Sequence, residues 1–156
     1  MRMSSIYYRG MFETMPYILP DKALSWNELK TVANNTMVAK VREFMSTNDL
    51  ACSEIVTNHQ KYSKDDLVVL EVIEGIEDLR VGVIKSIVVK DNKVFFVVRA
   101  YEAVKHAVGY YETVKLSVDY SFVEAKNLAD YKTLYRHGTD TKFQFVLHHH
   151  ISHDFI

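Results

Sequence analysis

The stretch from Leu67 to Tyr101 constrains the fold of this chain more than any other part of the sequence. It contains apolar runs that are rich in valine, isoleucine and phenylalanine, and short polar breaks separate them. Runs of this composition and length are typical of β-strands that pack into one core. The break at Asp91-Asn92 consists of two residues that tolerate a positive φ. It therefore predicts a two-residue hairpin turn.

The apolar pattern also predicts the position of the other strands. We expect strands at residues 50–57, 67–73, 80–89, 94–98, 113–122 and 142–151. Residues 80–89 and 94–98 are apolar on both faces, which indicates central strands that are covered on both sides. In residues 113–122 apolar and polar side chains alternate, and the apolar face holds Val114, Leu116, Val118, Tyr120 and Phe122. This alternation predicts a half-buried antiparallel strand.

Between and after these strands the sequence predicts irregular segments. Residues 73–80 read as a solvated loop, and residues 102–108 as a helical turn or a loop that ends at Gly109. Residues 127–135 are expected to cross the sheet with Leu128, Tyr131 and Leu134 facing inward.

A helix is expected before the sheet. Ser25 and Glu28 have the spacing of a capping box, in which a hydroxyl and a carboxylate satisfy free amides at a helix start. Apolar side chains then recur every three to four residues at Trp26, Leu29, Ala33, Met37, Val41 and Phe44. We predict an amphipathic helix from about Trp26 to about Met45, preceded by an irregular arm.

These elements define the expected fold class. It is a β-rich α+β fold, in which an N-terminal helix packs on a curled antiparallel sheet or SH3-like barrel of about six strands. Residues 1–49 would form the arm and the helix, and residues 50–156 a small β-barrel-like domain.

Charge and hydropathy exclude some classes of function. A formal net charge of −1 over 156 residues argues against a whole-domain grip on nucleic acid or anionic membrane, since phosphate binding needs a basic excess. The apolar runs are far shorter than the roughly 20 residues that span a bilayer, and the N-terminus lacks the pattern of a signal peptide. The one cysteine, Cys52, cannot form an internal disulfide and suits a reducing compartment. We therefore expect an intracellular protein with no membrane partner.

Two clusters resemble metal sites and are not predicted to be such. The tail carries His148, His149, His150, His153 and Asp154. Imidazoles bind zinc, nickel and copper, but adjacent histidines on a strand point to opposite faces, and no second cluster completes a closed site. The acidic residues Glu71, Glu74, Glu77 and Asp78 lack the ligand spacing of a calcium loop. We predict no metal and no cofactor.

No catalytic residue is predicted either. Cys52 has no nearby base that would activate it as a nucleophile, so it is interpreted as a small core residue. Nothing in the chain matches a phosphate loop, a dinucleotide fingerprint, a nucleophile elbow or a zincin helix. We therefore expect a protein that is not an enzyme.

Basic residues among aromatic ones form the remaining candidate site. The central strands carry Lys85, Lys90, Lys93, Arg99 and Tyr101. Basic side chains beside aromatic rings suit single-stranded nucleic acid on a small barrel. The alternative is that the lysines flank a hairpin and keep it soluble. We single out these residues as a candidate surface for nucleic acid or for a protein partner.

The order of several motifs resembles a known module. The motifs are QKYSKDDLVVL at 60–70, VGVIKSI at 81–87, VFFVV at 94–98, LADYKTL at 128–134 and FVLHHHI at 145–151. From about Ile55 onward this order is similar to the C-terminal module of transposon-derived animal proteins, where it follows a transposase-like body. Asp65 stands where that module usually has a glycine. The opening strands also resemble SH3-like and bromo-adjacent-homology barrels of chromatin proteins.

The resemblance implies a role without implying an activity. It favours a non-enzymatic accessory or protein-interaction module of a protein derived from a mobile element. The alternative that it leaves open is a chromatin or nucleic-acid binding β-barrel.

Overall fold

The structure is a computed structural model, and most of the residues that it describes lie in β-strands. It describes residues 17–18, 23–25, 41, 43–46, 49–57, 60–73, 75, 78–107 and 109–147. The strands are β1 (Tyr17–Ile18), β2 (Ala23–Ser25), β3 (Leu50–Cys52), β4 (Glu54–Thr57), β5 (Gln60–Ser63), β6 (Leu67–Val72), β7 (Leu79–Lys90), β8 (Lys93–Lys105), β9 (Tyr111–Glu124), β10 (Asp130–Leu134), β11 (Arg136–Gly138) and β12 (Phe143–Phe145). A 3-10 helix, η1 (Ala125–Asn127), follows β9.

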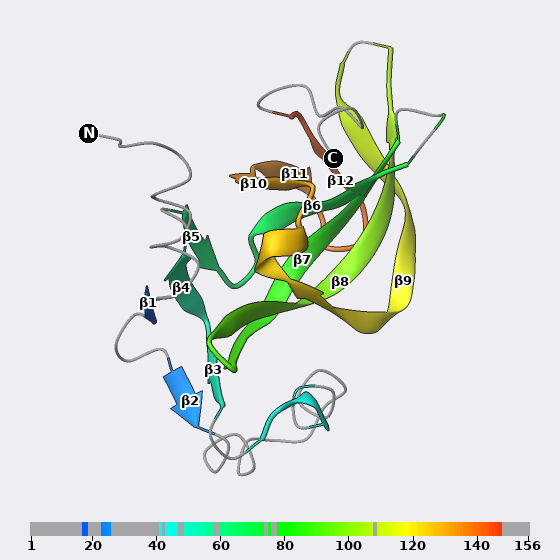
Figure 1. The fold of residues 1–156 in the computed structure, drawn as a ribbon. Helices are drawn as coiled ribbons and strands as arrows, with labels where there is room; N and C mark the ends of the chain where they lie inside the picture. The colour runs from blue at the N-terminus through cyan, green and yellow to red at the C-terminus, as the bar shows by residue number, and fades with distance from the viewer. Residues whose placement is uncertain are drawn as a thin grey trace, which may run out of the picture.

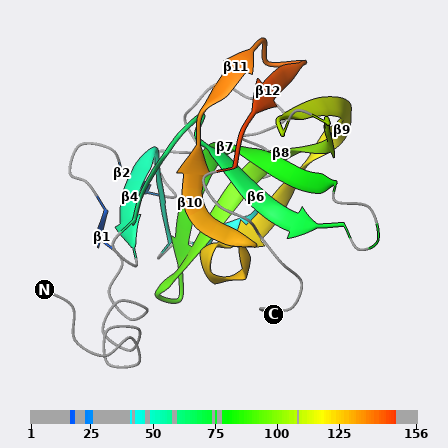
Figure 2. The same cartoon turned by 90° about the horizontal axis from the view of Figure 1, so that it is seen from above.

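One curled antiparallel sheet forms most of the structure (Figure 1). Its strands follow the order β10-β6-β7-β8-β9-β12-β11. The sheet curls into a half-barrel, which Figure 2 shows from above. Its two outermost strands, β10 and β11, are consecutive in the chain, and Tyr135 alone lies between them. The segment 130–138 therefore contributes both ends of the sheet.

The long strand β7 has two partners along one edge. β6 pairs with its first half, from Leu79 to Val83, and β3 pairs with its second half, from Ile87 to Val89. Between β3 and β6 the chain leaves the sheet as the hairpin β4–β5, to which β1 adds a third strand. A small sheet thus lies beside the half-barrel (Figure 1).

Both faces of β7 and β8 are covered, as their apolar composition predicts. Leu67, Tyr101, Leu134 and Phe143 come from different strands around the curl and pack together inside it. On the other face Ile55 and Tyr62 of the small sheet pack on Ile87, Phe96 and Val98. A third cluster lies near the turn between β7 and β8 and contains Val41, Met45, Ala51, Val88 and Val97.

The predicted fold class is wrong. The described residues form a β-rich structure with a curled half-barrel sheet, not an α+β fold with an N-terminal helix on a sheet or SH3-like barrel of about six strands. Ser25, the predicted helix cap, is instead the last residue of β2, and its backbone pairs with Leu50 of β3. Residues 26–40 of the predicted helix lie outside the described residues. Near its predicted end, Val41, Glu43 and Phe44 have helical backbone.

The local strand and turn predictions are confirmed for the hairpin at the centre of the sheet. Asp91 and Asn92 both have positive φ, 51° and 63°, as a two-residue turn of this kind requires. Strand β8, however, continues to Lys105, so the helical turn or loop expected at residues 102–108 is wrong for residues 102–105. His106 and Ala107 lie in the loop before Gly109, as expected. Residues 102–105 pair with residues 111–115 of β9, so pairing with a neighbouring strand extends β8 beyond its apolar part.

The predicted faces of β9 are wrong at its start. Thr113 is buried, whereas Val114 is 59 % exposed. The register between β8 and β9 shifts between Arg99 and Tyr101 and again between Glu102 and Ala103. Each such bulge turns the following side chains toward the other face of the strand.

Tyr131, predicted to face inward, is 56 % exposed. Its backbone carbonyl accepts a hydrogen bond of 2.6 Å from the Tyr62 hydroxyl, which fixes this part of β10 against β5. Leu134 is buried, as predicted.

In the described part of the chain no helix is long and apolar enough to cross a membrane.

Candidate functional site

The structure does not assemble the predicted basic surface. Lys90 Nζ lies 2.9 Å from Asp49 Oδ2, and Lys85 Nζ lies 3.4 Å from Asp65 Oδ1. Tyr101 is buried, and its hydroxyl donates a hydrogen bond to the Asp140 carbonyl. Lys93 is exposed at the hairpin turn. The two lysines in ion pairs and the buried tyrosine therefore serve the fold.

The Asp49–Lys90 pair is a structural contact at the start of β3. Burial alone would raise the pKa of Asp49, but hydrogen bonds from the Ser46 backbone N–H and from Lys90 outweigh it and lower the pKa. Lys90 also lies over the Phe44 ring, 5.7 Å from its centroid. Lys90 thus holds the segment before β3 against the hairpin β7–β8.

Arg99 differs from Lys85 and Lys90 because it forms no ion pair with a described carboxylate. It lies on β8 directly opposite Tyr120 of β9, and its guanidinium carbon is 5.6 Å from the centroid of that ring. Its Nε is buried and has no hydrogen-bond partner among the described residues. A buried donor without a partner costs about 1–3 kcal/mol, so such a group calls for an explanation.

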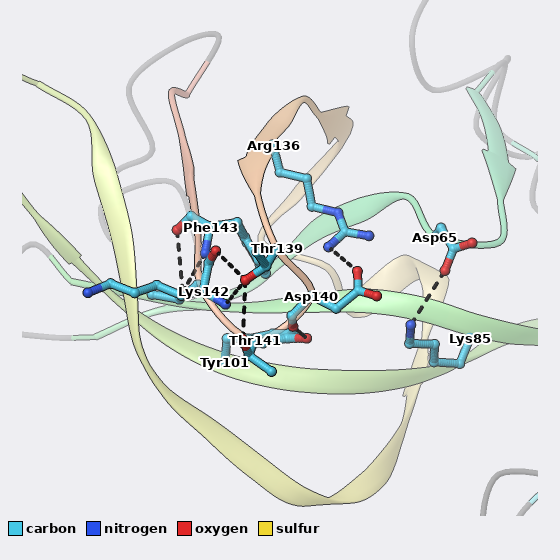
Figure 3. A network of polar contacts seen from close by, with 10 residues as sticks. Asp65, Lys85, Tyr101, Arg136, Thr139, Asp140, Thr141, Lys142 and Phe143 are labelled. Atoms are coloured by element: carbon cyan, nitrogen blue, oxygen red, sulfur yellow. Dashed lines mark hydrogen bonds and ion pairs between the residues drawn. The ribbon is translucent and has the colours of Figure 1, made fainter.

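The neighbouring cations on this side of the sheet already have carboxylate partners. Arg136 Nη1 lies 3.2 Å from Asp140 Oδ1, and Figure 3 shows this pair in one view with the Lys85–Asp65 pair. Burial raises the pKa of the Tyr101 hydroxyl, while Arg136 and Arg99 oppose this rise, so both guanidinium groups act on it. Unlike these two cations, Arg99 has no carboxylate partner among the described residues.

Beside Arg99 runs the outer edge of β9. This strand has 14 residues, and β8 pairs with it along one side. On the other side β12 pairs only with Tyr111 and Glu112. From residue 113 to residue 124 the outer edge has no partner strand within the described ranges. Figure 1 shows β9 at the rim of the sheet.

The last part of this edge is regular. Tyr120 to Glu124 pair one-to-one with Arg99 to Phe95, with no shift of register. Phe122 stacks on Phe44 with ring centroids 4.4 Å apart, and Phe44 makes an edge contact with Phe95. We call residues 120–124 the β9 edge. It is a regularly paired, aromatic stretch of strand, and its Tyr120 and Phe122 pack against the third core cluster.

The register also determines which backbone groups of the β9 edge point outward. Lys90 and Lys93 pair across the two-residue turn, so they exchange hydrogen bonds and alternate residues of β8 face β9. Val98 is one of these, and its partner Ser121 faces back toward β8. The residues that direct their N–H and C=O groups away from β8 are therefore Tyr120, Phe122 and Glu124.

The other predicted features offer no competing site. The histidine tail and Glu74 and Glu77 lie outside the described residues. Glu71 Oε1 is 3.7 Å from Arg80 Nη1, and Asp78 accepts a hydrogen bond from the Lys105 N–H. In the part of the chain that the structure describes, no group of three or more histidine, cysteine or acidic residues could hold a metal.

Cys52 is a core residue. Burial raises the pKa of its thiol to about 12, so the thiol stays protonated at neutral pH and is a poor nucleophile. It packs in the same cluster as Ile55 and Tyr62.

A cavity of about 290 Å³ lies over the middle of the sheet. Its lining residues are Glu71, Ile73, Arg80, Ala100, Tyr101, Glu102, Lys115 and Ser117. The charges there are balanced, since Arg80 pairs with Glu71, and Glu102 lies opposite Lys115 in the register of β8 and β9. The cavity therefore gives no preference for a charged ligand.

Comparison with known proteins adds no assignment. No protein-family model matches this chain, and no curated protein or solved structure matches it either. The candidate site therefore rests on the β9 edge and on Arg99.

Proposed function

We propose that this chain is a non-enzymatic protein-interaction module whose partner adds an extended segment to the β9 edge. The observation that carries the proposal is a regular, aromatic stretch of strand without a partner on its outer side in the described structure. An exposed strand edge presents a row of free N–H and C=O groups, and proteins use such edges to bind extended peptides. The main chain supplies affinity and the side chains beside it supply selectivity.

The charge distribution favours a peptide over nucleic acid as the occupant. Nucleic-acid binding needs several cations along a phosphate chain and accessible aromatic rings. Lys85 and Lys90 are in ion pairs, Tyr101 is buried, and the net charge is −1. Arg99, stacked on Tyr120 and without a described carboxylate partner, suits one acidic side chain instead.

The resemblance to the C-terminal module of transposon-derived proteins supports the same role. In such a parent protein the transposase-like body would hold the nucleic acid, and this module would contact another protein inside the cell.

A proline at Glu124 tests the proposal with little effect on the fold. Glu124 has φ −72° and ψ 136°, angles that proline adopts without strain, and its N–H points outward from the sheet. Glu124→Pro removes one donor of the β9 edge and places a ring where a docked strand would lie. Glu124→Ala is the matched control, because it removes the same carboxylate and keeps the N–H.

The measurement starts from random displayed peptides about ten residues long, selected on the immobilised full chain. We expect the selected peptides, once labelled, to bind at least about tenfold more weakly to Glu124→Pro than to Glu124→Ala. Equal binding to both variants would contradict docking at the β9 edge. Light scattering that shows a wild-type dimer and a Glu124→Pro monomer would also overturn the proposal, since the occupant would then be a second copy of the chain.

A further inference from the structure

We infer that the strand docked on the β9 edge carries an acidic side chain opposite Tyr120, and that Arg99 binds this carboxylate. The inference rests on the proposed function and names the chemistry of the partner. It assigns to Arg99 the selection of the bound segment.

The position of Arg99 follows from the strand register. Arg99 and Tyr120 are direct partners, so their side chains lie on the same face of the sheet. The guanidinium lies over the Tyr120 ring, which carries it from β8 toward the outer side of β9. A strand added to this edge would lie about 4.8 Å beyond β9. A side chain opposite Tyr120 would then stand on the same face, beside the ring and within reach of the guanidinium.

The chemistry of Arg99 specifies the group that it binds. A guanidinium offers donors in a planar fork, and a carboxylate accepts two of them at once. The buried Nε has no partner among the described residues, and the nearby carboxylates of Asp140 and Asp65 are held by Arg136 and Lys85. A carboxylate from the partner would accept hydrogen bonds from the outer guanidinium nitrogens and give this charge the ion pair that it lacks among the described residues. Stacking on Tyr120 keeps the guanidinium in place for it.

Two synthetic peptides test the inference on the full chain. One is acetyl-Thr-Val-Thr-Glu-Thr-Val-Thr-amide, and the other has glutamine in place of glutamate. Titrations are followed by the amide NMR signals of residues 120–123 in wild type, Arg99→Met and Glu124→Pro. Arg99→Met keeps an unbranched apolar stem against Tyr120 and removes the charge.

We expect wild type to bind the glutamate peptide about tenfold more tightly than the glutamine peptide, as one charge-assisted contact would give. Arg99→Met should bind both peptides equally, at the level of the glutamine peptide on wild type. That residual binding would also show that the variant is folded. Arg99→Lys should retain part of the preference, because it keeps the charge and loses the fork.

The outcomes separate the inference from the function on which it rests. If neither peptide shifts the signals of the β9 edge, the proposed docking itself fails. If both peptides bind wild type equally and Glu124→Pro weakens both, docking stands and the acidic selection is wrong. A preference for glutamate that persists in Arg99→Met would also overturn the role of Arg99.

Discussion

At the scale of single residues, the stability of this fold depends on side chains that are buried where the two sheets meet. Phe96 is fully buried, with its ring centroid 4.8 Å from that of Tyr62. Phe96→Ala should lower the free energy of unfolding by about 3–5 kcal/mol in urea, since it leaves a cavity between the sheets. Tyr135→Ala, at a side chain that is 83 % exposed, should change it by less than about 0.5 kcal/mol. A loss below about 1 kcal/mol for Phe96→Ala would contradict this packing.

Asp49 makes stability depend on pH. Its pKa is lowered in the folded chain from an ordinary value of 3.8, so folding favours the carboxylate. The contribution of Asp49 is therefore fully present above that ordinary value and is lost as pH falls through the lower, folded pKa. Urea unfolding of wild type and Asp49→Asn should differ clearly at about pH 6 and much less at about pH 2. A difference of the same size at both pH values would mean that charge is not the cause.

At the scale of the elements, β9 shows how a bulge changes which residues matter. Thr113 Oγ1 accepts a hydrogen bond of 3.0 Å from the Phe143 N–H and donates one to the Phe143 carbonyl. Thr113→Val should cost about 1–3 kcal/mol of unfolding free energy, because it leaves these buried groups without partners. The reverse exchange at the next residue, Val114→Thr, should be neutral within about 0.5 kcal/mol. Thermal melts of the two variants check this ranking. If Val114→Thr were the more destabilising variant, the alternation predicted from the sequence would be correct and the observed faces of β9 would be wrong.

The turn between β7 and β8 offers a test of backbone conformation alone. Asp91 is exposed and has φ 51°, a left-handed conformation that β-branched residues avoid. Asp91→Val should destabilise the hairpin by about 1–2 kcal/mol, whereas Asp91→Gly should be neutral or stabilising. Urea midpoints of the two variants decide the matter, and equal midpoints would exclude strain at this position.

The local elements were predictable from the sequence because their causes are local. Apolar runs located the central strands, and Asp91-Asn92 located the turn. The face of Val114 and the length of β8 were not predictable, since bulges and strand ends depend on the neighbouring strand. The capping pattern at Ser25 predicted a helix start, and pairing with Leu50 made that residue a strand end instead. Pairing partners distant in sequence override such local preferences.

At the scale of the whole molecule, the candidate site comes from the order of the strands. The sequence marked Arg99 as basic, but its stacking on Tyr120 arises only when β8 and β9 become neighbours. Within the described residues the outer side of β9 is free from residue 113 onward, and nothing in the local sequence marks it. This side is free because β12 pairs only with the start of β9. The predicted basic set therefore contained one residue of the proposed site and missed the strand beside it.

The curl of the sheet depends on the segment 130–138, and Gly138 is its most sensitive point. This segment pairs with β6 through β10 and with β12 through β11, so it joins the two ends of the half-barrel. Gly138 has φ +132°, and a Cβ there would lie 2.5 Å from the Lys142 carbonyl oxygen and 2.8 Å from Phe143 Cα. These atoms belong to the turn 139–143, whose hydrogen bonds around Thr139 appear in Figure 3.

Gly138→Ala should therefore weaken the connection that segment 130–138 makes between the two ends of the half-barrel. We expect a loss of at least about 2 kcal/mol in the free energy of unfolding, from backbone strain and from contact with fixed backbone atoms. Gly75→Ala is the matched control, because Gly75 also has a positive φ, +87°, but a Cβ there meets nothing within 4 Å. Hydrogen exchange should show faster exchange in Gly138→Ala for the amides of β6 as well as β12, since one segment holds both strands. Faster exchange confined to β11 and β12 would mean that the two ends of the sheet are stable independently.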